Sequence, residues 1–286
     1  SISEESRKDT ESRKRILNQS DIVILCLPDE AAREAVSFIE NEETRVIDAS
    51  TAHRTQNGWV YGFTECSEHQ SELINTAKRV ANPGCYAIGS ISIIRPLLEA
   101  GVLPSDWPLS INAISGYSGG GKSLIQDFEE PKNIGASETN FFAYGLDLKH
   151  KHIPEIMRWS GLSVAPIFLP SVGRFRQGML VQVPIPMWAL PKQLKTADIQ
   201  NLYEEYYSGC HFIQVSPLIN SISSERINPE ELNGTNSLRI NVFGNDNSDQ
   251  LVVNAILDNL GKGASGQVVQ NLNLMIGVPE TVGLKS

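Results

Sequence analysis

The stretch DIVILCLPDEAAREAVSFIE, residues 21–40, decides the fold of the first part of the chain. Its first eight residues are an apolar run that predicts a buried strand, and residues 29–40 have the apolar spacing of an amphipathic helix. TRVIDAS, at 44–50, predicts a second strand, and residues 4–18 predict a helix before the first. The order strand, helix, strand predicts a parallel sheet. Inside the apolar run we expect Cys26 to be a buried structural cysteine.

Small and acidic residues follow both predicted strands. Pro28-Asp29 comes after the first strand and Asp48-Ala49-Ser50 ends the second. Open parallel sheets bind ligands in the crevice outside the carboxyl ends of their strands. We therefore expect Pro28 and Ser50 to border a bound ligand.

After residue 105 the pattern becomes rich in β-structure. A helix is predicted at 197–208, and the last segment, 261–277, begins with glycines and continues as an amphipathic closing helix. Short apolar runs without intervening helices predict a mixed or antiparallel sheet. The predicted strands are 108–116, 165–171, 178–187, 211–216, 237–244 and 250–259.

Composition limits the classes of function. A chain of 286 residues is long enough for about two domains. A net charge of −9 argues against a broad nucleic-acid interface, because phosphate binding needs clustered Lys and Arg. The apolar run at 23–28 is far too short to span a bilayer, and the first fifteen residues are polar, unlike a secretory signal. Four scattered cysteines give neither a disulfide framework nor a metal spacing, so we expect a cytoplasmic protein without a metal.

RVANPGCYAIGS, at 79–90, places a cysteine behind a helix-start signal. Asn82 is a favoured N-cap, Pro83 suits the first helical position, and Gly84 lets the backbone approach closely. Cys85 then lies in the first turn, where unpaired N–H groups and the helix dipole lower the pKa of a thiol. We interpret Cys85 as a nucleophile rather than a buried structural cysteine.

A thiolate nucleophile needs an acid or base partner, and HKHIPEI holds two of the five histidines. His150 and His152 lie on one side of an extended segment, and Glu155 follows within one turn if a helix begins at Pro154. A carboxylate beside an imidazole supports its protonated form, as in general-acid catalysis. The same H-x-H pattern also occurs in partial metal sites and on surfaces. The residues alone leave both histidines open.

Five stretches together resemble the N-acetyl-gamma-glutamyl-phosphate reductase family, in its shorter type. They occur in the family's order and extend the resemblance from about residue 20 to the end of the chain. They are ANPGCYAIG (81–89), INAISGYSGGGKS (111–123), YGLDLKHKHIPEI (144–156), FLPSVGRFRQGMLVQVP (168–184) and NLGKGASGQVVQNLNLM (259–275).

The resemblance implies a two-domain α/β fold shared with aspartate-semialdehyde dehydrogenase. Residues 1–84 and 260–286 would form a Rossmann-like dinucleotide-binding domain, and residues 85–259 an α+β catalytic domain that carries the oligomer contacts. It further implies NADPH as hydride donor, a step in arginine biosynthesis, and a homodimer or homotetramer, for which strands 178–187 and 237–244 are the candidate contacts.

The resemblance also assigns residue roles. Cys85 is the nucleophile and His152 the general acid or base, while Glu155 and Tyr144 line the site. The segment Gln270-Asn271 lies near the nicotinamide, and Pro28 and Ser50 become cofactor contacts. A Cys85 thioester would form from an acyl phosphate and would then be reduced through a thiohemiacetal.

The phosphate and carboxylate of such a substrate need cations. The candidates flank the family stretches, and we rank Arg54 and Arg174 highest. The full set is Arg54, Lys122, Arg174 and Arg176.

Two other classes share parts of this pattern. GYSGGGKS, at 116–123, matches the P-loop pattern letter for letter, but the helix expected behind it is short, acidic and stopped by Pro131. We expect Ser118 and Gly119 to form a flexible loop that touches the cofactor or the substrate phosphate.

A Cys-His hydrolase could use the same cysteine and histidine, and only the reductase needs a nicotinamide. A related reductase acting on another acyl phosphate is the nearest alternative.

The sequence departs from the family at its start. A dinucleotide-binding domain opens with a strand, a Gly-rich turn and a helix, and no such turn precedes residue 20. We expect a strand-loop-helix unit of about 25–30 residues ahead of the printed sequence. The determinant of NADP over NAD would lie close to that start, where Ser6-Arg7-Lys8 is the one plausible 2′-phosphate site.

Overall fold

The structure is a computed structural model that describes residue 6 and residues 9–130, 139–218 and 226–286. Arg7, Lys8 and Pro131, which enter the expectations for a 2′-phosphate site and a helix stop, lie outside the described residues.

Clustering of close contacts divides the chain into two compact units. The first unit consists of residues 1–84 and 267–282, and the second of residues 85–266 and 283–286. The segment 260–266, assigned to the dinucleotide-binding domain by the sequence, groups with the second unit.

A four-stranded parallel sheet forms the centre of the first unit, which confirms the parallel sheet predicted from its sequence. The strand order is β1-β2-β4-β3, and the strands are β1 Ile22–Leu25, β2 Arg45–Asp48, β4 Arg79–Ala81 and β3 Val60–Tyr61. The helices of this unit are α1 Thr10–Asn18, α2 Asp29–Ser37 and α3 Gln70–Thr76, joined by most of α8 Gly266–Met275.

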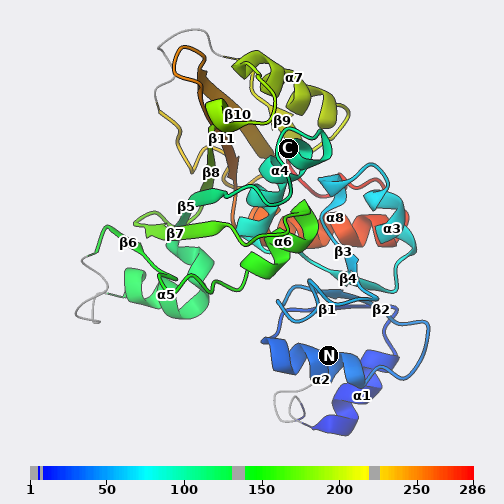
Figure 1. The fold of residues 1–286 in the computed structure, drawn as a ribbon. Helices are drawn as coiled ribbons and strands as arrows, with labels where there is room; N and C mark the ends of the chain where they lie inside the picture. The colour runs from blue at the N-terminus through cyan, green and yellow to red at the C-terminus, as the bar shows by residue number, and fades with distance from the viewer. Residues whose placement is uncertain (1–5, 7–8, 131–138, 219–225) are drawn as a thin grey trace. The chain divides into compact units, whose positions relative to one another are not determined.

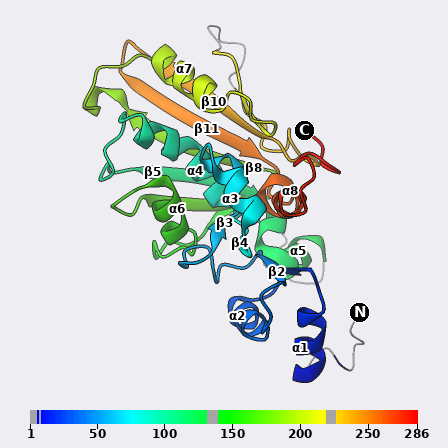
Figure 2. The same cartoon turned by 90° about the vertical axis from the view of Figure 1, so that its right-hand side faces the viewer.

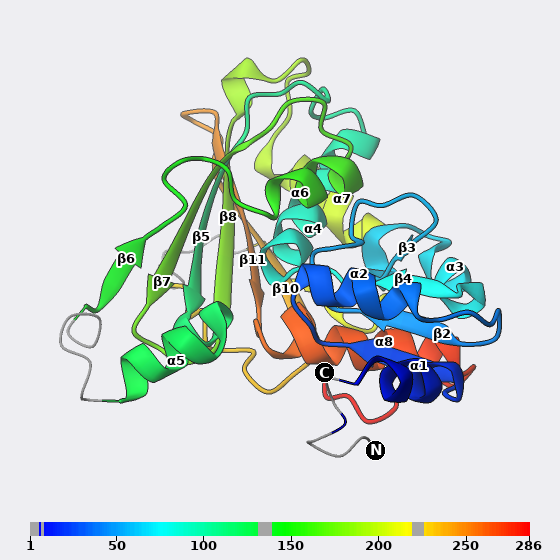
Figure 3. The same ribbon diagram turned by 90° about the horizontal axis from the view of Figure 1, so that it is seen from below.

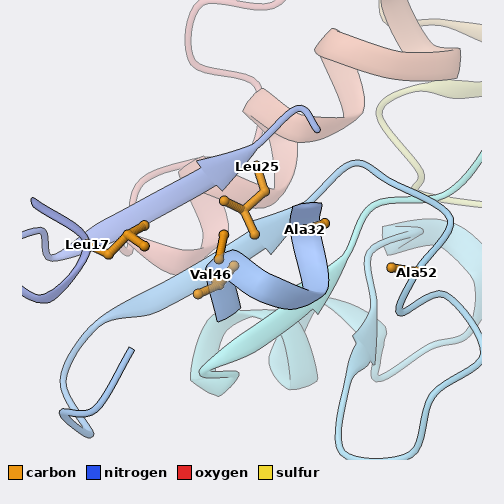
Figure 4. Packing of buried hydrophobic residues seen from close by; sticks show 6 residues of the cluster. Leu17, Leu25, Ala32, Val46 and Ala52 are labelled. Atoms are coloured by element: carbon orange, nitrogen blue, oxygen red, sulfur yellow. The ribbon is translucent and has the colours of Figure 1, made fainter. Parts of the chain in front are cut away.

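Neighbouring residues of β2 point to opposite faces of this sheet, and each face has its own core. Val46 packs with Leu17 of α1, Leu25 of β1 and Ala32 of α2, as Figure 4 shows. Figure 1 shows α1 and α2, in blue, on the same side of β1 and β2. On the other face the cluster consists of Ile47, Ile74, Ala77, Val80, Val268 and Met275, the last two from α8.

Cys26 corrects one prediction, because it is exposed rather than buried. Strand β1 lies at one edge of the described sheet and ends at Leu25, so Cys26 already belongs to the connection to α2. Ile24 and Leu27 are also exposed. The apolar run therefore forms a strand at the edge of the described sheet, which hydrophobicity alone does not distinguish from a central strand.

The second unit contains a seven-stranded mixed sheet, as predicted. Parallel pairs join β5 to β7 and β9 to β10, and the other pairs are antiparallel. In sheet order the strands are β6 Phe141–Ala143, β7 Ile167–Gly173, β5 Ser110–Gly116, β8 Met179–Pro186, β11 Gln250–Leu257, β10 Leu238–Asn245 and β9 Ile213–Val215.

Helix α4, Cys85–Glu99, is the central helix of this unit, and it is apolar on nearly every side because it is buried on nearly every side. It packs on β8 and β11, and Gly89 allows the close approach, since a Cβ there would lie 2.7 Å from a Val181 methyl. Helices α6, Ile153–Ser160, and α7, Thr196–Tyr206, pack against α4. Figure 3 shows α4 and α6 on one side of the sheet, and Figure 2 shows α7 along β10 and β11.

The remaining helices of the second unit follow strands. The 3₁₀ turn Tyr117–Gly120 and helix α5, Gly121–Glu129, continue from β5, and a 3₁₀ turn, Met187–Ala189, follows β8. A π-helical turn, Gly261–Ser265, connects β11 to α8. Single π turns inside or beside α-helices are frequent at functional sites.

Candidate active site

Cys85 is the first residue of α4 and is half-buried, which confirms its predicted place in the first turn of a helix. The helix begins two residues later than predicted. Asn82 lies three residues before the helix, and its side-chain oxygen accepts a hydrogen bond from the Asn271 amide at 3.0 Å. Because the helix begins at Cys85, Pro83 is not its first residue, and the N-cap role of Asn82 stays a prediction.

Gly263 lies against Cys85. A Cβ at Gly263 would be 2.7 Å from the Cβ of Cys85, closer than any ordinary contact. The N–H of Gly263 donates to the Asp258 carbonyl at 2.8 Å, which fixes the π turn around it. Only a glycine at this position leaves Cys85 in its present place, and no local pattern in the sequence indicates this contact.

Tyr86, the residue after Cys85, is the centre of an aromatic group that the sequence analysis missed. Its ring meets His150 and His152 edge-on, each with 5.9 Å between ring centroids, and Phe168 at 5.2 Å. The Tyr144 hydroxyl donates to the Tyr86 hydroxyl at 3.3 Å. The structure thus brings the two histidines and Tyr144 together around the residue next to the cysteine.

The histidine segment forms the start of α6. His152 occupies the N-cap position and is buried, and the helix begins at Ile153, one residue before the predicted start. Glu155 is buried in the first turn. The backbone N–H of His152 donates to Nδ1 of His150 at 3.2 Å. This bond distinguishes the two histidines, because an Nδ1 that accepts a hydrogen bond carries no proton.

Burial shifts the ionisation of the surrounding groups. It lowers the pKa of His150 to about 4, and the charge of neighbouring Lys151 lowers it further. Burial raises the pKa of Tyr144 to about 12, and a charged Cys85 opposes ionisation of the same phenol. Burial, with a smaller effect of Tyr144, raises the pKa of Tyr86 well above the ordinary value. Near neutral pH, His150 and both phenols are therefore uncharged.

The first unit holds a polar network after β2. Asp48 is fully buried and its carboxylate accepts from the backbone and hydroxyl of Ser50, at 2.9 and 2.7 Å, and lies 2.6 Å from His53 Nδ1. The His53 ring stacks on Trp59 with centroids 4.0 Å apart. Ser50 is thus tied to Asp48, and its hydroxyl oxygen accepts from the Ala52 N–H at 3.1 Å. The sequence predicted a ligand contact for Ser50 and no role for His53.

Gln270 and Asn271 on α8 are both fully buried within the first unit. The Gln270 amide donates to Glu65 at 3.0 Å and to Glu280 at 2.8 Å. Besides Asn82, the Asn271 amide donates to the Gly62 carbonyl at 2.9 Å. These bonds give both residues a place in the packing of α8 against the loop that follows β3, and their predicted nicotinamide contact stays a prediction.

Pro28 is the N-cap of α2, whose first turn carries Asp29 and Glu30. Two acidic side chains at a helix N-terminus repel an anion, so this turn does not fit a pyrophosphate.

Ser118, in the second unit, is buried, and its hydroxyl oxygen accepts a hydrogen bond from the Asn259 amide at 3.0 Å. Gly119 follows it, and a Cβ there would lie 2.9 Å from the Ser115 hydroxyl.

The P-loop interpretation fails on the backbone of residues 116–118. In a P-loop the amides of this stretch point at phosphates. Here the N–H groups of Gly116, Tyr117 and Ser118 donate to the carbonyls of residues 178, 175 and 176, all at 2.9–3.0 Å. A 3₁₀ turn replaces the open loop. The first three amides of GYSGGGKS are therefore bonded within the second unit and are not available to a phosphate.

The four candidate cations have different surroundings. Arg54, in the first unit, is buried and donates to the carbonyls of Asn82 and Ala49 at 2.9 and 3.0 Å. The other three belong to the second unit: Lys122 is exposed near the start of α5, Arg174 lies over the Phe128 ring, and Arg176 pairs with Glu129 at 3.5 Å with its side chain 64% exposed.

No group of three or more His, Cys, Asp or Glu side chains in the described part of the chain is close enough to hold a metal ion. Among the helices of that part, none is both long and apolar enough to cross a membrane.

Family models match both parts of the chain. Residues 3–74 match the semialdehyde dehydrogenase NAD binding domain, and residues 85–259 match the semialdehyde dehydrogenase dimerisation domain.

Solved structures of similar fold come from the same group. Aspartate semialdehyde dehydrogenase II from Vibrio cholerae has a TM-score of 0.68 at 15% identity, over 91% of this chain and 81% of that chain. Aspartate semialdehyde dehydrogenase from Francisella tularensis has a TM-score of 0.69 at 14% identity, over 94% and 85%. At such low identity these two structures establish the fold alone.

The curated relatives are much closer in sequence. N-acetyl-gamma-glutamyl-phosphate reductase 2 from Nostoc sp. is 48% identical, over 99% of this chain and 90% of the relative. The protein of the same name from Pseudomonas putida is 46% identical over the same shares, and the reductase from Chelativorans sp. is 49% identical over 96% and 89%. The chain therefore belongs to the N-acetyl-gamma-glutamyl-phosphate reductase family, a branch of the semialdehyde dehydrogenases.

Proposed function

We propose that the chain reduces N-acetyl-γ-glutamyl phosphate to N-acetylglutamate 5-semialdehyde with NADPH, as a step of arginine biosynthesis in the cytoplasm. The observation that carries the proposal is the 46–49% identity to reductases of this name over nearly the whole chain. Residues 1–84 and 260–286 would bind the dinucleotide, and residues 85–259 would carry the chemistry. Placement in the cytoplasm stays a prediction.

Cys85 is the proposed nucleophile. The N-terminus of α4 favours its thiolate, because the positive end of the helix dipole lies at the first turn. The sulfur attacks the acyl carbon, a C–S bond forms, and the bond from that carbon to the phosphate oxygen breaks. The products of this half-reaction are inorganic phosphate and a thioester on Cys85.

His152 is the proposed acid and base of the second half-reaction. NADPH, when bound, supplies the hydride that reduces the acyl carbon. The oxygen of that carbon becomes an oxyanion, which His152 protonates, and the same histidine removes this proton again as the C–S bond breaks. The semialdehyde leaves and Cys85 returns to its thiolate. His150 is unsuited to this role, since its pKa of about 4 leaves it uncharged near neutral pH.

The carboxyl ends of β1, β2 and β4 fit part of a dinucleotide. Pro28 follows β1, and Ser50 follows β2. Open parallel sheets bind ligands at this edge, whereas the acidic first turn of α2 does not fit the pyrophosphate. The family model supports a nicotinamide dinucleotide. The choice of NADPH over NADH is a proposal that a comparison of kcat/KM for the two nucleotides tests.

Self-association is proposed through the face of the second sheet that α4 leaves open. Strand register places Ile167 and Leu169 on this face, and both are exposed. At one end of the face a hollow is lined by Pro184, Phe243 and the 72% exposed Trp188. The match of residues 85–259 to a dimerisation domain supports a second copy as the occupant. Light scattering of wild type and Trp188→Glu tests this, with a smaller species expected for the variant.

The test of the function is loss of NADPH absorbance when N-acetyl-γ-glutamyl phosphate is added to the purified chain. Wild type should oxidise NADPH, and Cys85→Ser should lose the activity. Cys210→Ser is the matched control, because Cys210 is also a half-buried cysteine of the second unit but lies just after α7 and should not affect turnover. Phosphate release from the substrate at full rate without NADPH would instead indicate the Cys-His hydrolase.

A further inference from the structure

A pocket of about 420 Å³ opens in the second unit beside the nucleophile. Tyr86, the neighbour of Cys85, forms one wall with Tyr144 and His150, and Leu124 with Ser123 of α5 forms the opposite wall. Its volume falls in the range of small-molecule sites. The mechanism above uses the cysteine and His152 and leaves this pocket without an occupant.

The polar groups of the pocket wall are mostly uncharged. Hydroxyls come from Tyr86, Tyr144, Ser115 and Ser123. His150 adds a donor, because its Nδ1 accepts the N–H of His152 and its proton in the neutral ring is therefore on Nε2. Lys151 and Asp127 are the charged side chains of the lining, and they are of opposite sign. Such a wall suits a neutral group that both donates and accepts hydrogen bonds.

An apolar surface completes the pocket. Leu124, Phe142 and Val172 contribute aliphatic and aromatic carbon to the lining. A small methyl group therefore has carbon to pack against, next to hydroxyl and imidazole groups that can bond an amide. An ammonium or carboxylate would lose its hydration here without a net opposite charge to replace it.

We propose that this pocket binds the N-acetyl end of the substrate and selects acyl phosphates that carry an acylated amino group. The proposal rests on the proposed function and adds the residues that recognise the group remote from the reacting carbon. The His150 Nε2–H donates to the acetyl carbonyl, the hydroxyls meet the amide, and the methyl packs on Leu124 and Phe142. The γ-acyl phosphate then extends toward Cys85.

Filling the pocket from α5 tests the proposal. Ser123 is exposed yet lines the pocket, so Ser123→Trp can place an indole in it with little effect on the core. Gln126→Trp is the matched control, because Gln126 is equally exposed on α5 and lies outside the lining. The two substrates are N-acetyl-γ-glutamyl phosphate and glutaryl phosphate, which has the same chain and acyl phosphate without the acetylamino group.

Wild type and Gln126→Trp should prefer the N-acetyl substrate by about 10²-fold in kcat/KM, the discrimination expected of a pocket that packs and hydrogen-bonds one group. Ser123→Trp should lower this ratio to near one by raising KM for the N-acetyl substrate. Its alkylation of Cys85 by iodoacetamide should stay at the wild-type rate, which shows that the variant folds.

Two results would overturn the proposal. One is an unchanged ratio in Ser123→Trp, and the other is a wild-type enzyme that reduces both substrates equally well. Both are distinct from a failure of the proposed function, in which wild type would oxidise NADPH with neither substrate.

Discussion

The backbone N–H of His152 donates a hydrogen bond to Nδ1 of His150, with 3.2 Å between the nitrogens. The bond holds His150 in one neutral form, and burial keeps it so by lowering its pKa to about 4. His150 is therefore unsuited to act as an acid near neutral pH, and His152 is the histidine of HKHIPEI that we propose for this role.

Two single variants test this assignment. His152→Asn should lower kcat by about 10²–10⁴-fold, the usual contribution of a general acid or base. His150→Asn should act mainly on KM for the N-acetyl substrate, because it removes a donor from the pocket and leaves the acid in place. Steady-state NADPH oxidation measures both. A collapse of kcat in His150→Asn with a normal His152→Asn would reverse the two roles.

Acid sensitivity of the fold provides a second prediction. The pKa of His150 falls from its ordinary value of 6.5 in the unfolded chain to about 4 in the folded chain. Between these values the unfolded chain binds more protons, so the free energy of unfolding decreases as the pH falls from 6.5 to 4. This loss of stability is reduced by solvent screening, because His150 is only partly buried.

His150→Asn should therefore lose less stability than wild type over this range. Urea unfolding at pH 7 and pH 4.5 measures the difference for each protein. Equal losses in the two proteins would show that the His150 ring titrates in the native state as it does in the unfolded chain.

Gly263→Ala should disable Cys85 without unfolding the protein. The new Cβ would lie 2.7 Å from the Cβ of Cys85, and relief requires a shift of the nucleophile or of the π turn. A displacement of this kind can lower kcat about 10²-fold. Ser265→Ala, an exposed position in the same turn, should remain near wild type. Activity and iodoacetamide labelling of Cys85 are the two measurements, and wild-type values for both in Gly263→Ala would disprove the constraint.

The sequence predicted the elements whose pattern is local. Residues 21–28 and 44–50 are apolar enough to be strands, and a helix between them makes the pair parallel. Cys85 could be placed at a helix start because Pro and Gly precede it. Strand β4 was missed, because Arg79–Ala81 is three residues long and shows no periodicity.

The rest depends on contacts between distant residues. Cys26 was predicted buried because hydrophobicity does not show that β1 lies at the edge of the described sheet or that the strand ends before Cys26. His150 and His152 are equivalent by spacing, and only the fold places the His152 N–H on His150. Gly263 is far from Cys85 in sequence, and nothing local reveals that the π turn brings them together.

The most direct measurement is the state of Cys85 after one turnover without reductant. The protein is mixed with excess N-acetyl-γ-glutamyl phosphate, quenched in acid, and analysed for phosphate and for the mass of the peptide that contains Cys85. We predict one phosphate per active site, an N-acetylglutamyl group on Cys85 as a thioester, and its loss as semialdehyde when NADPH is added before the quench. An unmodified Cys85 peptide in a preparation that nevertheless reduces the substrate would contradict the covalent mechanism.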